Sequence, residues 1–265
     1  MGVLAGFVTI PLSMFEAWPV ITDPFFYAVA IPAVLLLGVS KSGFGSGFGS
    51  LAVPMMALSV TVSEAAAILM PLLFVMDVLG SAAFRKDFDP VLLRRILPFG
   101  ILGIVLGALL FKLVPPHAVS AVVGVVTLVF LAQRVLWKAS TTLSPPDWLG
   151  RVLSATSGFT SFVAHAGGPP INAYFIGLRL SPVRFAATMS FFFFALNLCK
   201  WLPYAWLGLL DVRNMATAMV LLPLAPVGVW GGVRLARHVS QVLFYRLVYA
   251  GMLLTGLKLV WDGFA

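Results

Sequence analysis

The chain has 265 residues, of which 61% are hydrophobic and 10% are charged. An average soluble domain carries about a quarter charged residues, so this composition excludes a soluble globular protein and requires lipid as a second apolar solvent. The net charge of +8 does not indicate nucleic-acid binding, because the basic residues punctuate hydrophobic runs instead of clustering.

Residues 1–23 are predicted to form an N-terminal lead-in, amphipathic or extended. They contain Glu16 and Pro19 and lack the basic start of a secretory signal peptide. Beyond them, six hydrophobic runs have the length of about 20 residues that a membrane-spanning helix needs. These runs are 64–84, 91–112, 117–137, 182–207, 213–233 and 240–261.

Two further runs, 25–62 and 148–178, are too long for one straight span and are interrupted by small residues. The first interruption is Lys41–Ser50 and the second is Ser157–Asn172. Sliding one onto the other by 115 positions gives five identities, which predict an internal duplication. The matched residues are Ser42 with Ser157, Gly43 with Gly158, Phe44 with Phe159, Ser46 with Ser161 and Pro54 with Pro169.

The predicted fold is therefore an all-α integral membrane protein of two repeated four-element halves. Each half starts with a broken or re-entrant helix, and the halves are inverted relative to each other. The first repeat is 24–138, the linker is 139–147 and the second repeat is 148–265.

Two topologies distribute the basic residues differently. If the broken segments cross the membrane, one side holds 85, 86, 94, 95, 134, 138, 151, 213 and 258, and the other holds 112, 179, 184, 234, 237 and 246. If they are re-entrant hairpins, one side holds only 112, 213 and 258, and the other side holds the remaining twelve basic residues. The positive-inside rule favours the second arrangement, with both termini outside; a broken crossing stays the alternative.

The two interruptions are the predicted binding site, because irregular backbone at membrane depth is tolerated only beside protein or a water-filled cavity. Glycine-rich backbone can form a concave nest of N–H groups, Pro169 suits the start of a half-helix, and Lys41 adds positive charge, all of which suit an anion. The substrate-binding candidates in the interruptions are Lys41, Ser42, Gly43, Gly45, Ser46, Gly47, Ser161, His165, Gly167, Gly168, Pro169 and Asn172.

Three polar residues lie inside predicted spans, where they are functional hypotheses by default. Asn197 and Lys200 share a helix face and are added to the substrate-binding candidates, although Lys200 is also close enough to the end of its run to snorkel. Asp77 is the candidate for proton coupling; a structural ion pair with Lys41 or Lys200 is its alternative.

Other features are assigned to packing or membrane contact. Gly103 and Gly107 have the spacing of a close helix contact. Phe191–Phe194, with Trp201 and Trp206, is assigned to lipid contact and interfacial anchoring.

No enzyme activity, cofactor or metal site is expected. The sequence has no P-loop, zinc-protease or nucleophile-elbow motif, and its single cysteine, Cys199, cannot form an internal disulfide or a cysteine-rich metal site. The expected partners are a small anionic substrate and membrane lipid, with no nucleic acid, and the expected state is a monomer or homodimer.

The segment SGFTSFVAHAGGPPINAYFIGLRLSP, with FFFFALNLCKWLPY after it (157–204), resembles the second-half signature of the TauE/SafE permeases, the sulfite exporter family. SKSGFGSGFGSLAVPMM (40–56) is similar to the first-half signature. The resemblance implies a multi-pass secondary transporter of the bacterial cytoplasmic membrane that moves sulfite, sulfoacetate or another organosulfonate.

The predicted function is thus transport of a small sulfur-containing anion by alternating access, with proton coupling through Asp77 as an option. Another small anion such as a carboxylate, or a passive anion channel, is the alternative. The sequence leaves the transport direction open.

Overall fold

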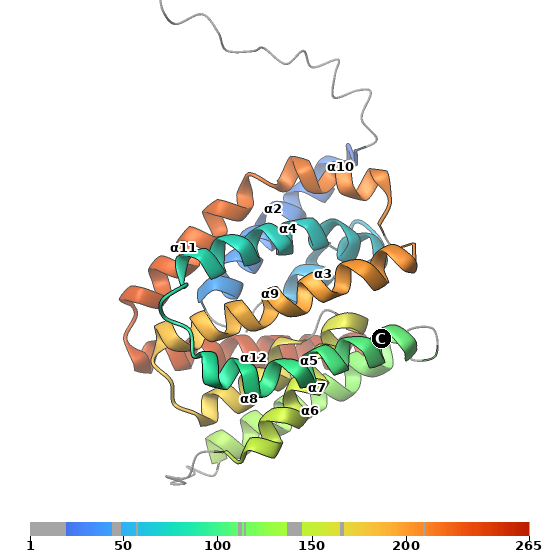
Figure 1. Cartoon of the computed structure of the whole chain (residues 1–265). Helices are drawn as coiled ribbons and strands as arrows, with labels where there is room; N and C mark the ends of the chain where they lie inside the picture. Colours follow the sequence, from blue (N-terminus) through green and yellow to red (C-terminus); the bar gives the residue numbers. More distant parts are fainter. Residues whose placement is uncertain are drawn as a thin grey trace, which may run out of the picture.

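In the computed structural model of the chain, the described elements are α-helices and one short 3-10 helix (Figure 1). It describes residues 20–43, 49–56, 58–110, 113, 115–136, 145–164, 167–208 and 210–264. Most of the predicted lead-in, 1–19, lies outside these residues.

Five long helices coincide with predicted spans: α4 (Val62–Ala83), α5 (Pro90–Leu110), α6 (Pro116–Leu136), α9 (Pro182–Trp206) and α12 (Gln241–Phe264). Their starts follow from local chemistry. Thr61 and Glu64 form a capping box at α4, and the Ser181 hydroxyl accepts the Arg184 N–H at α9. The element types and starts were therefore predictable from the sequence.

The prediction of an ordinary span over 213–233 is wrong. This run forms two helices, α10 (Val212–Leu221) and α11 (Leu224–His238), whose axes bend by 53° at the break. Pro223 lies in the break and has no N–H to continue the helical hydrogen bonds. In the described part of the chain, five helices are long and apolar enough to cross a membrane, or six if this bent pair is one span. The five are α2, α4, α5, α9 and α12.

The first interrupted run folds back on itself. It consists of α2 (Pro24–Gly43), the short 3-10 turn η1 (Gly49–Leu51) and α3 (Ala52–Met56). Beyond α3, the Ser59 hydroxyl donates to Asp23 Oδ2 at 3.2 Å. Because Asp23 directly precedes α2, the chain has returned to the end at which this segment began, as a re-entrant hairpin does.

The second interrupted run also folds back, through α7 (Asp147–Ala164) and α8 (Gly168–Gly177). The Ser157 hydroxyl donates to the Gly167 carbonyl at 2.6 Å near the turn. Further along, a Cβ on Gly150 would lie 2.4 Å from the Tyr174 ring, so α8 runs back beside α7. Both interrupted runs therefore fold back on themselves as helical hairpins.

The breaks are shorter than predicted. Lys41–Gly43 forms the last turn of α2, and α7 continues through Ser157 to Ala164. Gly158 does not end α7, because it serves packing: a Cβ there would lie 2.0 Å from the Gly100 carbonyl oxygen of α5. The assignment of Gly103 to close packing is confirmed in the same way, since its Cβ would lie 2.0 Å from the Ala155 carbonyl oxygen.

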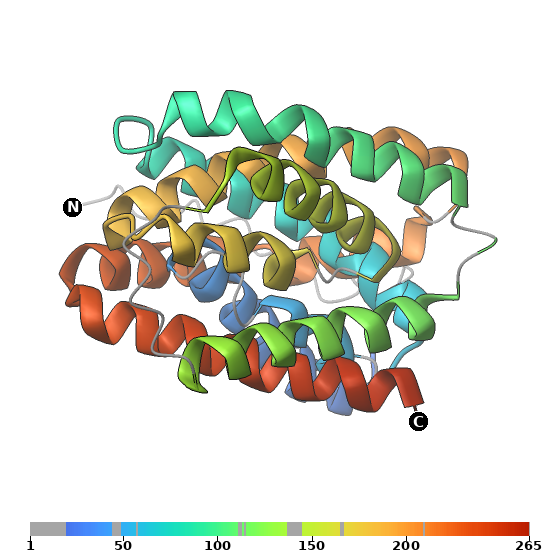
Figure 2. The same ribbon diagram turned by 90° about the horizontal axis from the view of Figure 1, so that it is seen from below.

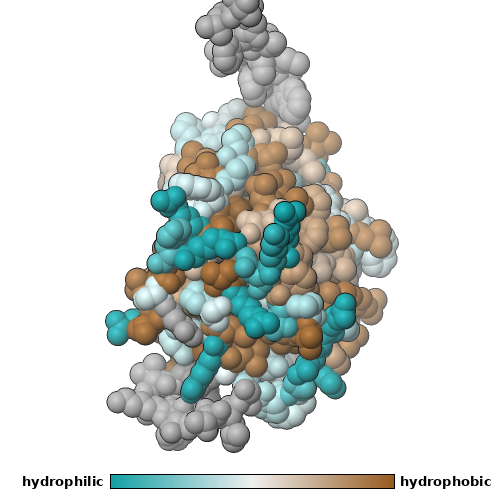
Figure 3. Space-filling view, turned by 60° about the vertical axis from the view of Figure 1, so that its left-hand side comes forward, coloured by the Kyte–Doolittle hydropathy of each residue, from teal (hydrophilic) through white to brown (hydrophobic). Residues whose placement is uncertain are grey.

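The helix ends gather at two opposite ends of the molecule. At one, Arg237 pairs with Asp87 at 2.8 Å and Arg184 with Asp89 at 3.3 Å; we call this the basic end. Figure 3 shows hydrophilic side chains gathered here on an otherwise apolar surface. We call the opposite end the Asp23 end; there Glu64 lies 3.7 Å from Arg213. The α2 hairpin starts from the Asp23 end, and the α7 hairpin starts from the basic end.

Two hydrophobic clusters form the core, and each draws helices from both halves of the chain. The α2 cluster joins α2, α3 and α4 to α10 and α11. The α7 cluster joins mainly α5, α6, α7, α8, α9 and α12, and it lies below the α2 cluster in Figure 1. Helices α6 and α12 pack side by side at its edge (Figure 2).

Candidate functional site

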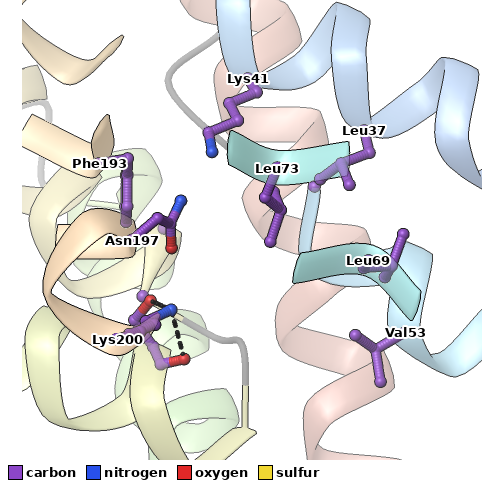
Figure 4. Close-up of a pocket in the computed structure, with 12 residues that line it drawn as sticks. Leu37, Lys41, Val53, Leu69, Leu73, Phe193, Asn197 and Lys200 are labelled. Carbon is purple, nitrogen blue, oxygen red and sulfur yellow. Dashed lines mark hydrogen bonds between the residues drawn. The ribbon is translucent and has the colours of Figure 1, made fainter. Parts of the chain in front are cut away.

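A cavity lies where the two clusters meet, and its two walls differ in chemistry (Figure 4). Leucine and valine side chains of α2, α3 and α4 form the apolar wall. Polar groups of α7, α8 and α9 form the polar wall opposite. The lining residues are Leu37, Lys41, Gly49, Val53, Leu69, Leu73, Ser161, Gly167, Gly168, Phe193, Asn197 and Lys200.

Lys41 projects into the cavity from the last turn of α2, and its charge is neutralised inside the protein. Its ammonium lies 2.5 Å from Asp77 Oδ1. The other carboxylate oxygen of Asp77 accepts a hydrogen bond from Asn197 Nδ2 at 2.8 Å. The three side chains are at most 4% exposed, so this ion pair joins α2, α4 and α9 in a medium where either charge alone would be costly.

Lys200 is the second buried cation, and its side chain does not snorkel to the surface. It is 1% exposed, and its ammonium donates to the Ser161 carbonyl at 2.9 Å and hydroxyl at 2.6 Å. Ser161 lies in the last turn of α7, where carbonyls lack helical partners and the helix dipole favours a cation. Two of three ammonium protons are thereby used, which leaves one for a ligand in the cavity.

Lys200 has no internal counter-ion comparable to that of Lys41. Within the described residues, every ion pair involves other cations, and no carboxylate lies within ion-pair distance of Lys200. A buried ammonium without a carboxylate favours an anionic ligand.

The turn into α8 brings backbone to the same wall. Gly167 has no room for a side chain, since a Cβ would lie 2.6 Å from Ser161 Cβ and 2.8 Å from the Ser157 carbonyl oxygen. Helix α8 then begins at Gly168 with proline in its first turn, as predicted. Its positive N-terminal end therefore faces the cavity beside Lys200, which again suits an anion.

The comparisons with known proteins agree with this chemistry. A family model described as Sulfite exporter TauE/SafE matches residues 30–259. The chain belongs to the TauE/SafE family. Comparisons with curated proteins and with solved structures find no match. Membership of the TauE/SafE family makes the chain a membrane transport protein and implies sulfite or a related sulfur-containing anion as its class of cargo.

In this TauE/SafE protein, six of the fourteen predicted binding residues come together: one from the first interruption, three from the second and two from α9. Those that line the cavity are Lys41, Ser161, Gly167, Gly168, Asn197 and Lys200. Asp77 stands behind this wall and contacts Lys41 and Asn197.

Other predicted residues have different surroundings. The Ser42 hydroxyl donates to the Gly38 carbonyl at 2.5 Å and lies 3.2 Å from the Val229 carbonyl, so it bonds backbone within α2 and on α11. Pro169 and Asn172 are buried in α8, and the Asn172 carboxamide has no hydrogen-bond partner in the described part of the chain. Gly43 is the last residue of α2.

Four predicted residues, Gly45, Ser46, Gly47 and His165, lie outside the described residues. The expected nest of N–H groups in the first interruption therefore stays a prediction.

Sequence reasoning missed the apolar side of the site. Phe193, assigned above to lipid contact, is 5% exposed and lines the cavity. The apolar wall (Leu37, Val53, Leu69 and Leu73) was not predicted either. In a chain that is 61% hydrophobic, no local signal separates an apolar residue that faces a cavity from one that faces lipid.

Proposed function

We propose that the chain is a secondary transporter that moves a small sulfur-containing anion, such as sulfite, sulfoacetate or another organosulfonate, across the cytoplasmic membrane. The observation that carries this proposal is the buried ammonium of Lys200, which lines the cavity without a carboxylate partner. A sulfonate or sulfite oxygen would accept its remaining proton, and the Ser161 side of the wall and the start of α8 would stabilise the negative charge.

We propose alternating access as the transport mechanism and an inverted repeat as its structural basis. The opposite starting ends of the α2 and α7 hairpins support this proposal. The packing of α2 with α11 and of α7 with α5 supports it further, because each hairpin pairs with a helix of the other half. Access from the basic end requires separation of Arg237 from Asp87, and access from the Asp23 end requires separation of Glu64 from Arg213.

Under the positive-inside rule the basic end would face the cytoplasm. Single-cysteine labelling in a Cys199→Ala background tests this orientation. A cysteine at Lys86 should react with a membrane-impermeant thiol reagent only from the inside, and a cysteine at Lys258 only from the outside.

The transport mechanism is tested by counterflow in proteoliposomes preloaded with unlabelled ethanesulfonate. A carrier that alternates between two faces accumulates labelled ethanesulfonate transiently above the external concentration. A passive channel only equilibrates it. Accumulation absent from protein-free vesicles supports the carrier; equilibration without overshoot would favour the channel instead.

Asp77 is our proposed proton-coupling residue, because it is fully buried and contacts two cavity residues, Lys41 and Asn197. In proteoliposomes, Asp77→Asn should remove the stimulation of anion flux by an imposed pH gradient. Counterflow without a gradient should persist. Retained stimulation would assign proton coupling to another group.

A further inference from the structure

The charged groups at the cavity do not balance. In the described part of the chain they are Lys41, Asp77 and Lys200, each at least 96% buried. The carboxylate of Asp77 lies 2.5 Å from the Lys41 ammonium and neutralises it. Lys200 donates its hydrogen bonds to neutral groups, the carbonyl and hydroxyl of Ser161, and it interacts with Asp77 only beyond ion-pair distance. With these three groups ionised, the site carries a net single positive charge.

One negative charge on a ligand completes this balance, and a second would be in excess. An unbalanced charge in a low-dielectric site costs several kcal/mol in general, which corresponds to more than a tenfold difference in affinity. Among the described residues, the wall opposite Lys200 is formed mainly by Leu37, Val53, Leu69 and Leu73, whose side chains offer no hydrogen bond to a second anionic group.

We infer that the site is charge-selective: it takes an anion with one negative charge in preference to a dianion, and Asp77 sets this preference by neutralising Lys41. The inference rests on the proposed function and narrows its cargo by charge: it favours hydrogen sulfite or a simple monosulfonate, and it disfavours sulfoacetate, which carries two negative charges at neutral pH. It makes Asp77 a specificity-determining residue that acts through Lys41 and need not touch the substrate.

Calorimetric titration of the purified full-length protein with ethanesulfonate and with 1,2-ethanedisulfonate tests the inference. These probes carry one and two charges. The titrations are run at pH 7, where a histidine of ordinary pKa is mostly neutral, and at matched ionic strength. The wild type should bind ethanesulfonate at least about tenfold more tightly than 1,2-ethanedisulfonate.

Asp77→Asn leaves both lysines charged, so the site gains one positive charge. The affinity ratio should then shift by at least about tenfold towards the disulfonate. The double variant Lys41→Met/Asp77→Asn removes both members of the pair and should restore the wild-type ratio. Because the probes are the same throughout, their difference in size cancels from these shifts.

Lys41→Met provides a second variant of opposite sign, in case Asp77→Asn does not fold. It leaves Asp77 to balance Lys200, so ethanesulfonate affinity should fall about tenfold below that of the double variant. A ratio unchanged by Asp77→Asn, or equal ethanesulfonate affinity in Lys41→Met and the double variant, would overturn the inference. Failure of the wild type to bind either anion would instead overturn the proposed function, and the inference with it.

Discussion

The two cations at the cavity differ in the way their charge is balanced. Lys41, on α2, lies 2.5 Å from Asp77 of the neighbouring helix α4. Lys200, on α9, is bonded only to neutral oxygens of Ser161. Both are buried, so burial alone does not identify the ligand-binding cation. The ligand-binding cation is therefore identified by the absence of an internal counter-ion.

The same contrast separates the two sides of the cavity. The α2 cluster contributes aliphatic side chains and an ion pair that is already satisfied. The α7 cluster contributes an ammonium, a hydroxyl and the first residues of α8. We expect substitutions on the first side to affect stability and charge preference, and those on the second to affect binding directly.

The largest expected effect is on stability. Lys41→Met leaves the Asp77 carboxylate buried without its cation, and breaking a buried pair costs about 3–5 kcal/mol of folding free energy. Thermal unfolding in detergent should show a lowered Tm, and Lys41→Met/Asp77→Asn should recover most of the loss. Equal loss in the two variants would mean that the pair matters only through packing of the Lys41 chain.

Replacement of Lys200, the cation on the α7 side of the cavity, should weaken binding strongly with less effect on the fold. Lys200→Met should weaken ethanesulfonate binding roughly 100-fold, because truncating one partner of a buried charged contact costs about 3 kcal/mol. Lys258→Met is the matched control, since Lys258 is 39% exposed and pairs with Asp262. Binding that survives in Lys200→Met would end the contrast between the two lysines.

The turn before α8 gives the third prediction. Gly167→Ala places a Cβ atom 2.6 Å from Ser161 Cβ and 2.8 Å from the Ser157 carbonyl oxygen. Displacing these groups should cost about 1–3 kcal/mol and weaken anion binding about tenfold. In Gly231→Ala the nearest atom, on Val39, is 3.5 Å away, so affinity should stay within about twofold of the wild type.

The smallest effect is expected from the hydroxyl that orients Lys200. Ser161→Ala removes one of the two hydrogen bonds to the ammonium and keeps the bond to the carbonyl. A single hydrogen bond contributes about 1 kcal/mol, so ethanesulfonate affinity should change roughly fivefold in calorimetric titration. A loss as large as that of Lys200→Met would show that Ser161 itself binds the anion.

The strengths and errors of the sequence predictions have local causes. The long spans were predictable because their apolar runs begin at caps such as Thr61 and Ser181, whose hydrogen bonds are made within one turn. The run 213–233 was misjudged because hydropathy averages over Pro223, which only the bend of 53° makes visible. The exact breaks were misplaced because Gly158 serves packing against α5 and does not end a helix.

The site was predictable in its polar members and unpredictable in its connections. Ser161, Gly168 and Lys200 stand out in an apolar sequence, since polar groups and irregular backbone are costly in lipid. The sequence left two partners open for Asp77, and the fold places it beside Lys41. Phe193 gave no signal at all, because it stands in a run of four phenylalanines that differ in burial and not in residue type.

A multi-pass membrane protein with two interrupted segments is recognisable from the sequence, because hydropathy, small residues and caps act within a few turns of chain; the signature segments add the TauE/SafE family. Tertiary structure alone decided which helices form each cluster, which lysine is neutralised and which apolar side chains face the cavity. These depend on contacts between residues far apart, such as Asp77 with Asn197, 120 positions on. Such contacts follow from the way whole helices pack, which no local pattern encodes.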